Sequence, residues 1–172
     1  MISFLIGENN FEVTRTLKRL IAEFDGEVEQ IDGSELTAQQ LPDLLMGATL
    51  FSATRLVVIK GLAENKSVWN EFESWIGRVS DDVHLVLIEP KPDKRTKTYK
   101  ALSKAASVQE FPAWTERDML RAEAWVVEEA KSQQLELDKK SAQLLVERVG
   151  VDQWQLYYAI QKLTALGQAS PA

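Results

Sequence analysis

The sequence predicts an α/β domain built on a parallel sheet, followed by a smaller unit made only of helices. Two observations support this prediction. Up to about residue 112, short apolar runs alternate with segments whose apolar residues recur at helical spacing. Three of these runs lack the polar alternation of a half-exposed strand, which indicates a parallel sheet of Rossmann-like type that is covered on both faces. After that point only amphipathic helical patterns remain.

The expected strands and helices follow one another along the first part of the chain. Apolar or β-branched runs predict strands, and apolar residues repeated every three or four positions predict helices. The strands are expected at residues 2–6, 28–31, 55–60, 83–88 and 108–111. The helices are expected at about residues 11–24, 36–46, 68–79 and 96–106. Gly26 ends the first helix, and the Asp32-Gly33-Ser34 turn supplies a cap for the second.

Three further helices are expected after the sheet, in the segments TERDMLRAEAWVVEEAKSQQ, DKKSAQLLVERVG and DQWQLYYAIQKLTAL. Thr115 and Asp118 have the spacing of a capping box at the start of the first one. Because the strand pattern stops just before Pro112, we place a domain boundary there. The expected domains are residues 1–112, which form the α/β domain, and residues 113–172, which form a small helical domain.

Composition excludes several classes of function. The 172 residues are 45% hydrophobic and 27% charged, which is typical of a globular protein. With no cysteine and a single histidine, His84, neither a disulfide nor a structural zinc site is expected. No apolar stretch is long enough for a membrane span or a signal peptide, so we expect a cytoplasmic protein. The net charge of -6 is unfavourable for a dedicated duplex-binding module.

The turn after the first expected strand lies where nucleotide-binding α/β domains hold phosphates. In such domains, glycines let backbone amides approach the phosphate and a lysine supplies positive charge. Here Glu12 and Val13 stand where the second glycine and the lysine would be. A carboxylate and an apolar side chain oppose phosphate binding. We therefore interpret Gly7, Glu12, Val13 and Thr14 as a degenerate phosphate loop that binds no nucleotide.

Catalytic and metal sites are not expected elsewhere. The strand at 55–60 ends in Lys60 and leads into Gly61, where a Mg²⁺ site would need Asp or Glu. His84 lies within an expected strand and has no nucleophile motif beside it, so we interpret it as a packed structural residue. The sequence therefore predicts no catalytic residue, no bound metal and no cofactor.

The order and spacing of four segments resemble one family. The segments are LIGENNFEVTRTL, LMGATLFSATRLVVIKG, PKPDKRTKTYKALSKAASVQEF and AKSQQLELDKKSAQLLVERVGVDQWQLYYAIQKL. Together they look like the delta subunit of the bacterial DNA polymerase III clamp loader. The resemblance implies an AAA+-like module, in which a Rossmann- or RecA-like sheet is followed by a small three-helix lid domain. It also implies a helical collar domain, which this chain would lack as a fragment.

The resemblance also implies a function in DNA replication. A delta subunit binds the ring-shaped sliding clamp, the beta subunit, and helps open it for loading onto DNA, while neighbouring subunits bind and hydrolyse ATP. The chain is thus expected to be non-catalytic by itself and to belong to a DNA-directed DNA polymerase holoenzyme, a nucleotidyltransferase. Its expected partners are the clamp and, in the full-length protein, other loader subunits. The fragment itself is expected to be monomeric, with DNA contacted weakly or indirectly.

By the same resemblance, the clamp contact lies at the end of the second helix and in the turn that follows. An adjacent Leu-Phe pair would fill an apolar pocket on the clamp, and here that pair is Leu50-Phe51, preceded by Ala48 and Thr49. Gly47 favours the end of the helix, which would let both side chains project. The alternative is that the pair enters the core beneath the next strand.

A basic cluster follows the fourth expected strand, and its candidates for contact with DNA or a neighbouring subunit are Lys94, Arg95, Lys97 and Lys100. A solvated helix face is the alternative for each lysine. Three other functions stay open: an ATP-hydrolysing or arginine-donating loader subunit, an active nucleotide-binding enzyme with an atypical loop, and an unrelated α/β interaction adaptor. The lack of cysteine argues against the first, because those loader families carry cysteine-rich zinc modules.

Overall fold

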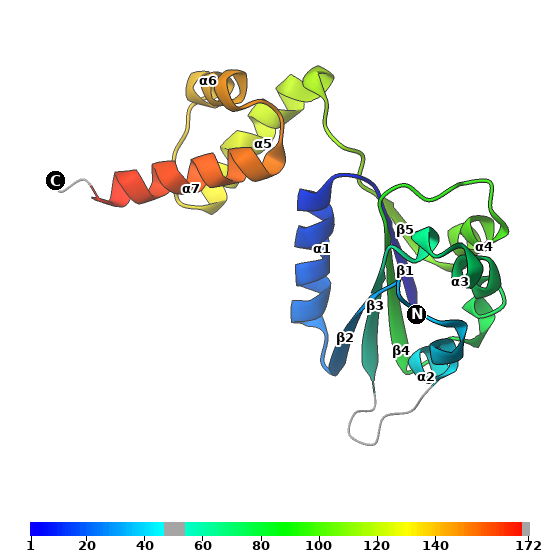
Figure 1. Cartoon of the computed structure of the whole chain (residues 1–172). Coiled ribbons are helices and arrows are strands. Elements are labelled where there is room, and N and C mark those ends of the chain that lie inside the picture. The colour runs from blue at the N-terminus through cyan, green and yellow to red at the C-terminus, as the bar shows by residue number, and fades with distance from the viewer. Residues whose placement is uncertain (47–53, 170–172) are drawn as a thin grey trace. The chain divides into compact units, whose positions relative to one another are not determined.

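The computed structural model describes residues 1–46 and 54–169 (Figure 1). The chain divides into two compact units, Met1–Ala113 and Trp114–Ala172. Within the described ranges, the first unit contains all the strands and four α-helices, and the second contains three α-helices.

A parallel sheet forms the centre of the first unit. Its described strands are β1 (Ile2–Ile6), β2 (Glu27–Asp32), β3 (Arg55–Lys60), β4 (Val83–Glu89) and β5 (Ser107–Glu110). They lie in the order β2-β3-β4-β1-β5, and every neighbouring pair is parallel. The residues of β1 are buried throughout, as are the central residues of β3 and β4. This burial explains why these three strands are apolar without alternation and confirms the predicted α/β fold.

Helices cover both faces of the sheet (Figure 1). α1 (Asn10–Glu23) lies on one face, where its Val13 and Leu17 pack on Leu5 and on alternate residues of β3 and β4. α2 (Leu41–Met46), α3 (Lys66–Phe72) and α4 (Lys97–Ala105) share the other face. The chain moves along the sheet in one direction from β1 to β2 and returns through β3 and β4. Right-handed crossovers then place α1 opposite the other three helices.

Two helices of the first unit are shorter than the sequence predicted. The helix expected at 36–46 begins after Thr37, whose hydroxyl and amide both donate to the Gln40 side chain in a capping box, and its first turn, Ala38–Gln40, is a 3-10 turn that leads into α2. The helix expected at 68–79 begins earlier, at Lys66, and α3 ends at Phe72. The Ser74 hydroxyl donates to the Glu71 carbonyl at 2.8 Å, a local bond of the kind that competes with helix continuation.

The described part of the second unit, residues 114–169, holds the three expected helices. They are α5 (Met119–Ser132), α6 (Lys139–Val149) and α7 (Gln153–Ala169). The Thr115–Asp118 capping box forms as predicted, around a short 3-10 turn that leads into α5. Small and branched residues of the three helices make the core of this unit: Ala122, Val126, Ala130, Ala142, Val146, Leu156 and Ile160.

Candidate functional site

The backbone amides of the turn between β1 and α1 donate hydrogen bonds to other groups of the protein. The Gly7 amide donates to the Glu89 carbonyl at 3.1 Å, and the Asn9 amide donates to the Phe111 carbonyl at 3.0 Å. The Glu12 amide donates to the Asn9 side chain at 3.1 Å, which caps α1. These amides would have to be free to bind a phosphate. The local geometry therefore provides a physical reason for treating this turn as a structural link rather than a phosphate cradle.

The side chains of residues 12–14, at the start of α1, are also buried or half-buried in the fold. Val13, which stands in place of the lysine, is 7% exposed and packs between α1 and the sheet. Glu12 and Thr14 are half-buried at the start of α1. Gly7 has a φ of 139°, a conformation that favours glycine. The structure thus places Gly7 in the turn after β1 and Glu12, Val13 and Thr14 at the start of α1, and none of the four supplies a positive charge.

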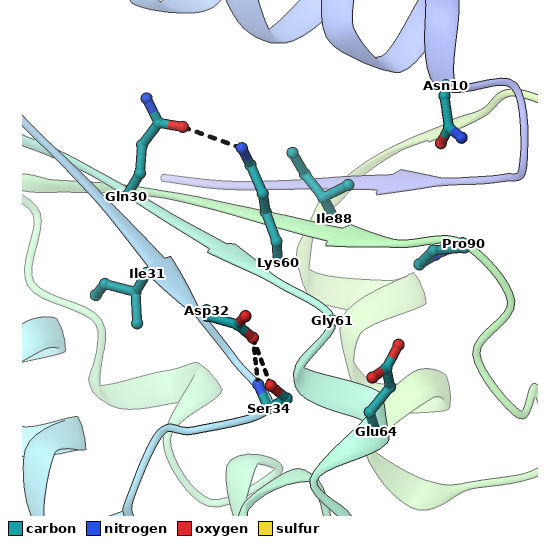
Figure 2. A pocket seen from close by; sticks show the side chains of 10 residues that line it. All are labelled: Asn10, Gln30, Ile31, Asp32, Ser34, Lys60, Gly61, Glu64, Ile88 and Pro90. Atoms are coloured by element: carbon teal, nitrogen blue, oxygen red, sulfur yellow. Dashed lines mark hydrogen bonds between the residues drawn. The ribbon is translucent and has the colours of Figure 1, made fainter.

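A cavity of about 490 Å³ lies at the ends of β2, β3 and β4, beside the first residue of α1. Figure 2 shows the side chains that line it. The Asp32 carboxylate accepts hydrogen bonds from the Ser34 amide at 2.9 Å and hydroxyl at 2.7 Å, and these bonds lower the pKa of Asp32. Lys60, a cation at this cavity, donates to the Gln30 side chain at 3.1 Å. With Glu64 also in the lining, the carboxylates oppose a phosphate group.

Glu89 is a buried carboxyl group at the end of β4, close to this cavity. Its residue is 2% exposed, and its side chain accepts a hydrogen bond from the Ala63 amide at 3.1 Å. Burial raises the pKa of Glu89 to about 7, while the backbone bonds from Ala63 and Leu62 oppose the shift and the nearby Glu64 carboxylate adds to it. The carboxyl group therefore caps the 3-10 turn Leu62–Glu64 and titrates near neutral pH. Sequence reasoning missed this residue, because an acid at a strand end is usually exposed.

Metal-ligating side chains do not gather in the described ranges 1–46 and 54–169, where no group of three or more His, Cys, Asp or Glu could hold an ion. His84 has the structural role predicted for it, because its Nε2 is 2.9 Å from the Ser3 hydroxyl and its ring lies near Phe24. Over the same ranges, no helix is long and apolar enough to cross a membrane.

The predicted clamp-binding residues Ala48, Thr49, Leu50 and Phe51 lie outside the described residues. Their two flanks are described. On the first flank, Met46 at the end of α2 is 53% exposed, and the preceding Leu45 carbonyl accepts a hydrogen bond from the Ser80 amide at 2.9 Å. The end of α2 is therefore fixed to the loop before β4.

The second flank begins at Thr54, whose hydroxyl donates to the Asp25 carbonyl at 2.9 Å. The Arg55 guanidinium then donates to the Asp43 carbonyl of α2 at 3.1 Å and to the Glu29 carboxylate of β2 at 2.7 Å. The Arg55 side chain is only 11% exposed. It links α2 to the sheet across the ends of the segment 47–53, so both ends of this segment are attached to the folded α/β unit.

The basic cluster splits into two groups in the structure. Lys94 pairs with Glu110 at 3.0 Å, and Arg95 makes two bonds with the Asp93 carboxylate, at 3.0 and 2.9 Å. Lys97 and Lys100 lie exposed on α4 without an ion-pair partner in the described part of the chain. The four predicted residues therefore differ in the structure: Lys94 and Arg95 each hold a carboxylate, whereas Lys97 and Lys100 remain candidates for contact with a partner.

Comparison with known proteins identifies the family. The model of the family described as DNA polymerase III, delta subunit, matches residues 4–111, well over half of the chain. The chain belongs to this family. The matched range covers the α/β unit of this delta-subunit chain, from β1 to the residue after β5.

A solved structure extends the likeness to the helical unit. The Bacillus subtilis DNA clamp loader delta protein (YqeN) is similar to this chain with a TM-score of 0.71 and 22% sequence identity. The alignment covers 98% of this chain and 54% of the Bacillus protein, so the delta-subunit chain spans about half the length of that relative. At this identity the likeness shows a shared fold, which agrees with the predicted fold class of a parallel α/β sheet accompanied by helices. No curated protein matches the sequence significantly.

Proposed function

We propose that this delta-subunit chain binds the sliding clamp and helps open it for loading onto DNA, while other subunits of the loader hydrolyse ATP. Leu50 and Phe51 are the proposed anchors, with Ala48 and Thr49 beside them. Residues 1–112 would act as the clamp-binding domain and residues 113–172 as the lid. The proposal includes a cytoplasmic location and a monomeric state for this chain.

The observation that carries the proposal is the attachment of both ends of the segment 47–53. A clamp-binding pair gains affinity when its framework is already ordered, because less conformational freedom is lost on binding. The bonds of Leu45 to Ser80, of Thr54 to Asp25 and of Arg55 to Asp43 provide such a framework. Each would hold an end of the segment in place before the clamp arrives.

Met46 adds an apolar surface next to the proposed anchors. Met46 is 53% exposed at the end of α2 and directly precedes, in the sequence, the segment that carries the proposed anchors, so a clamp that binds the anchors would meet it. Met is also adaptable in shape, which suits a partner-binding edge. Met46 would therefore extend the contact made by Leu50 and Phe51.

The same chain is unsuited to nucleotide hydrolysis. The amides of Gly7 and Asn9 already donate to protein carbonyls, and Asp32 and Glu64 line the nearby cavity. These features support a role in which neighbouring subunits, and not this chain, bind and hydrolyse ATP. They give no support to the alternative of an active nucleotide-binding enzyme.

The proposal is tested by measuring the affinity of the chain for the purified cognate sliding clamp. Met46→Ala should weaken binding by about three- to tenfold, because part of a Met side chain contributes about 1 kcal/mol when buried. Leu120→Ala is the matched control, since Leu120 is 78% exposed on α5. It should leave clamp affinity unchanged. Absence of clamp binding by the unaltered chain, or equal losses in both variants, would contradict the proposal.

A further inference from the structure

Positive charge is concentrated in one segment of this acidic chain. Residues 91–105 contain six Lys or Arg and a single acid, Asp93, although the whole chain has a net charge of -6. The rest of the chain is therefore more acidic than the total suggests. Such segregation on a folded surface creates a local positive potential that attracts an anionic partner.

Three of these six cations lie together on α4. Lys94 and Arg95 are engaged by Glu110 and Asp93, as described above. Lys97, Lys100 and Lys104 remain exposed, and none has an ion-pair partner within residues 1–46 and 54–169. At 100° per residue the three side chains leave the helix within about 60° of one another, over a length of about 10 Å. We call these three residues the lysine face of α4.

The lysine face is held on a fixed helix. α4 lies beside α3 on the same face of the sheet (Figure 1). The Trp69 indole of α3 donates to the Thr96 hydroxyl at 3.2 Å, and the Thr98 hydroxyl donates to the Trp69 carbonyl. Leu102, on the opposite side of α4, is fully buried. The lysines therefore project from a rigid support, and only their own side chains need to be ordered by a partner.

The chemistry of this face favours nucleic acid over protein. Between the lysines, the exposed positions carry Ser103 and no large apolar side chain. Protein interfaces are depleted in lysine and depend on apolar or aromatic anchors, whereas backbone contacts to DNA are made by lysine and arginine with phosphate. We propose that the lysine face of α4 binds the phosphate backbone of duplex DNA without regard to sequence. This goes beyond clamp binding and does not depend on it.

The expected binding is weak and sensitive to salt. Non-specific binding of this kind has a dissociation constant of about 10⁻⁴ to 10⁻⁶ M at physiological salt. Three phosphate contacts predict that the logarithm of the binding constant falls with the logarithm of salt concentration with a slope of about -2.7. The acidic remainder of the chain keeps the affinity low.

The experiment titrates the chain, without clamp, into a short fluorescent duplex of mixed sequence and follows anisotropy at several salt concentrations. Each single change among Lys97→Gln, Lys100→Gln and Lys104→Gln should reduce the slope by about one and weaken binding about tenfold at about 50 mM salt. The triple variant should lose detectable binding. Replacing all three by Arg should retain it, because Arg keeps the charge and contacts phosphate.

The control is a triple Lys→Gln variant of the second unit at Lys139, Lys140 and Lys162, which are exposed and change the net charge equally. It should keep both slope and affinity close to those of the unaltered chain. Equal losses in the two triple variants, or no duplex binding by the unaltered chain at low salt, would overturn the proposal. Lysine-dependent binding to polyglutamate without duplex binding would also overturn it and assign the face to an acidic protein. Clamp affinity measured in the same variants should not change, so failure of clamp binding is detected separately.

Discussion

Glu89→Gln should remove a pH-dependent destabilisation of the α/β unit. Glu89 is 2% exposed, and its pKa rises from the usual 4.5 to about 7 in the folded protein. Because the folded state holds this proton more tightly than the unfolded state, protonation stabilises the fold. This contribution is complete below pH 4.5 and is lost as the pH rises through 7. The difference corresponds to about 3 kcal/mol, at about 1.4 kcal/mol for each pKa unit.

The assay is urea unfolding of both proteins at pH 5 and pH 8. The glutamine carbonyl can still accept the hydrogen bond from the Ala63 amide, which Glu89 now accepts at 3.1 Å. The gain in stability from Glu89→Gln should therefore be larger at pH 8 than at pH 5, by up to about 3 kcal/mol. Glu71→Gln, at an exposed position of α3, is the matched control and should show no such difference. Equal effects of Glu89→Gln at the two pH values would show that burial does not raise the pKa of Glu89.

Three further predictions concern the other sites. Calorimetry should detect no Mg-ATP binding, because the Gly7 and Asn9 amides already donate to carbonyls; sub-millimolar affinity that is lost on mutating this turn would contradict this. Gln134→Gly should raise the thermal midpoint, with a stability gain of about 0.5–1 kcal/mol, because Gln134 has a φ of 62° at the end of α5; a lower midpoint would show that its side chain stabilises the helix end. Arg55→Ala should lower the free energy of unfolding in urea by about 1–3 kcal/mol and weaken clamp binding, because the guanidinium links α2 to β2. Unchanged clamp affinity would argue against the proposal that the attached ends of segment 47–53 contribute to clamp binding.

The central strands were predictable from sequence. β3 begins and ends where the apolar run at 55–60 predicted, and β4 extends the prediction only by Glu89. A continuous apolar and β-branched run predicts a central strand of a parallel sheet, because such a strand is buried on both faces. The Asn65 cap of α3 and the Thr96 cap of α4 follow local rules, because each side chain accepts a hydrogen bond from a backbone amide at the start of its helix.

Features that depend on tertiary packing were missed. The burial of Glu89 requires the turn after β3 to fold over the end of β4, and nothing in the local sequence shows this. Lys94 and Glu110 are 16 positions apart, so their pairing could not be distinguished from a free basic cluster. The second helix begins later than expected, after Thr37, because the capping box between Thr37 and Gln40 fixes its first turn. The role of Leu50 and Phe51 came from family resemblance and stays a prediction.

The clamp assignment is tested most directly by one double variant, Leu50→Ala with Phe51→Ala, on which clamp affinity and thermal midpoint are both measured. Burying two large apolar side chains contributes about 3–6 kcal/mol before the entropy cost of binding, so affinity should fall by about two to four powers of ten. The midpoint should change little, because truncating side chains that project to a partner leaves no cavity in the core. A large fall in midpoint with unchanged affinity per folded molecule would show that the pair belongs to the core and would contradict the account.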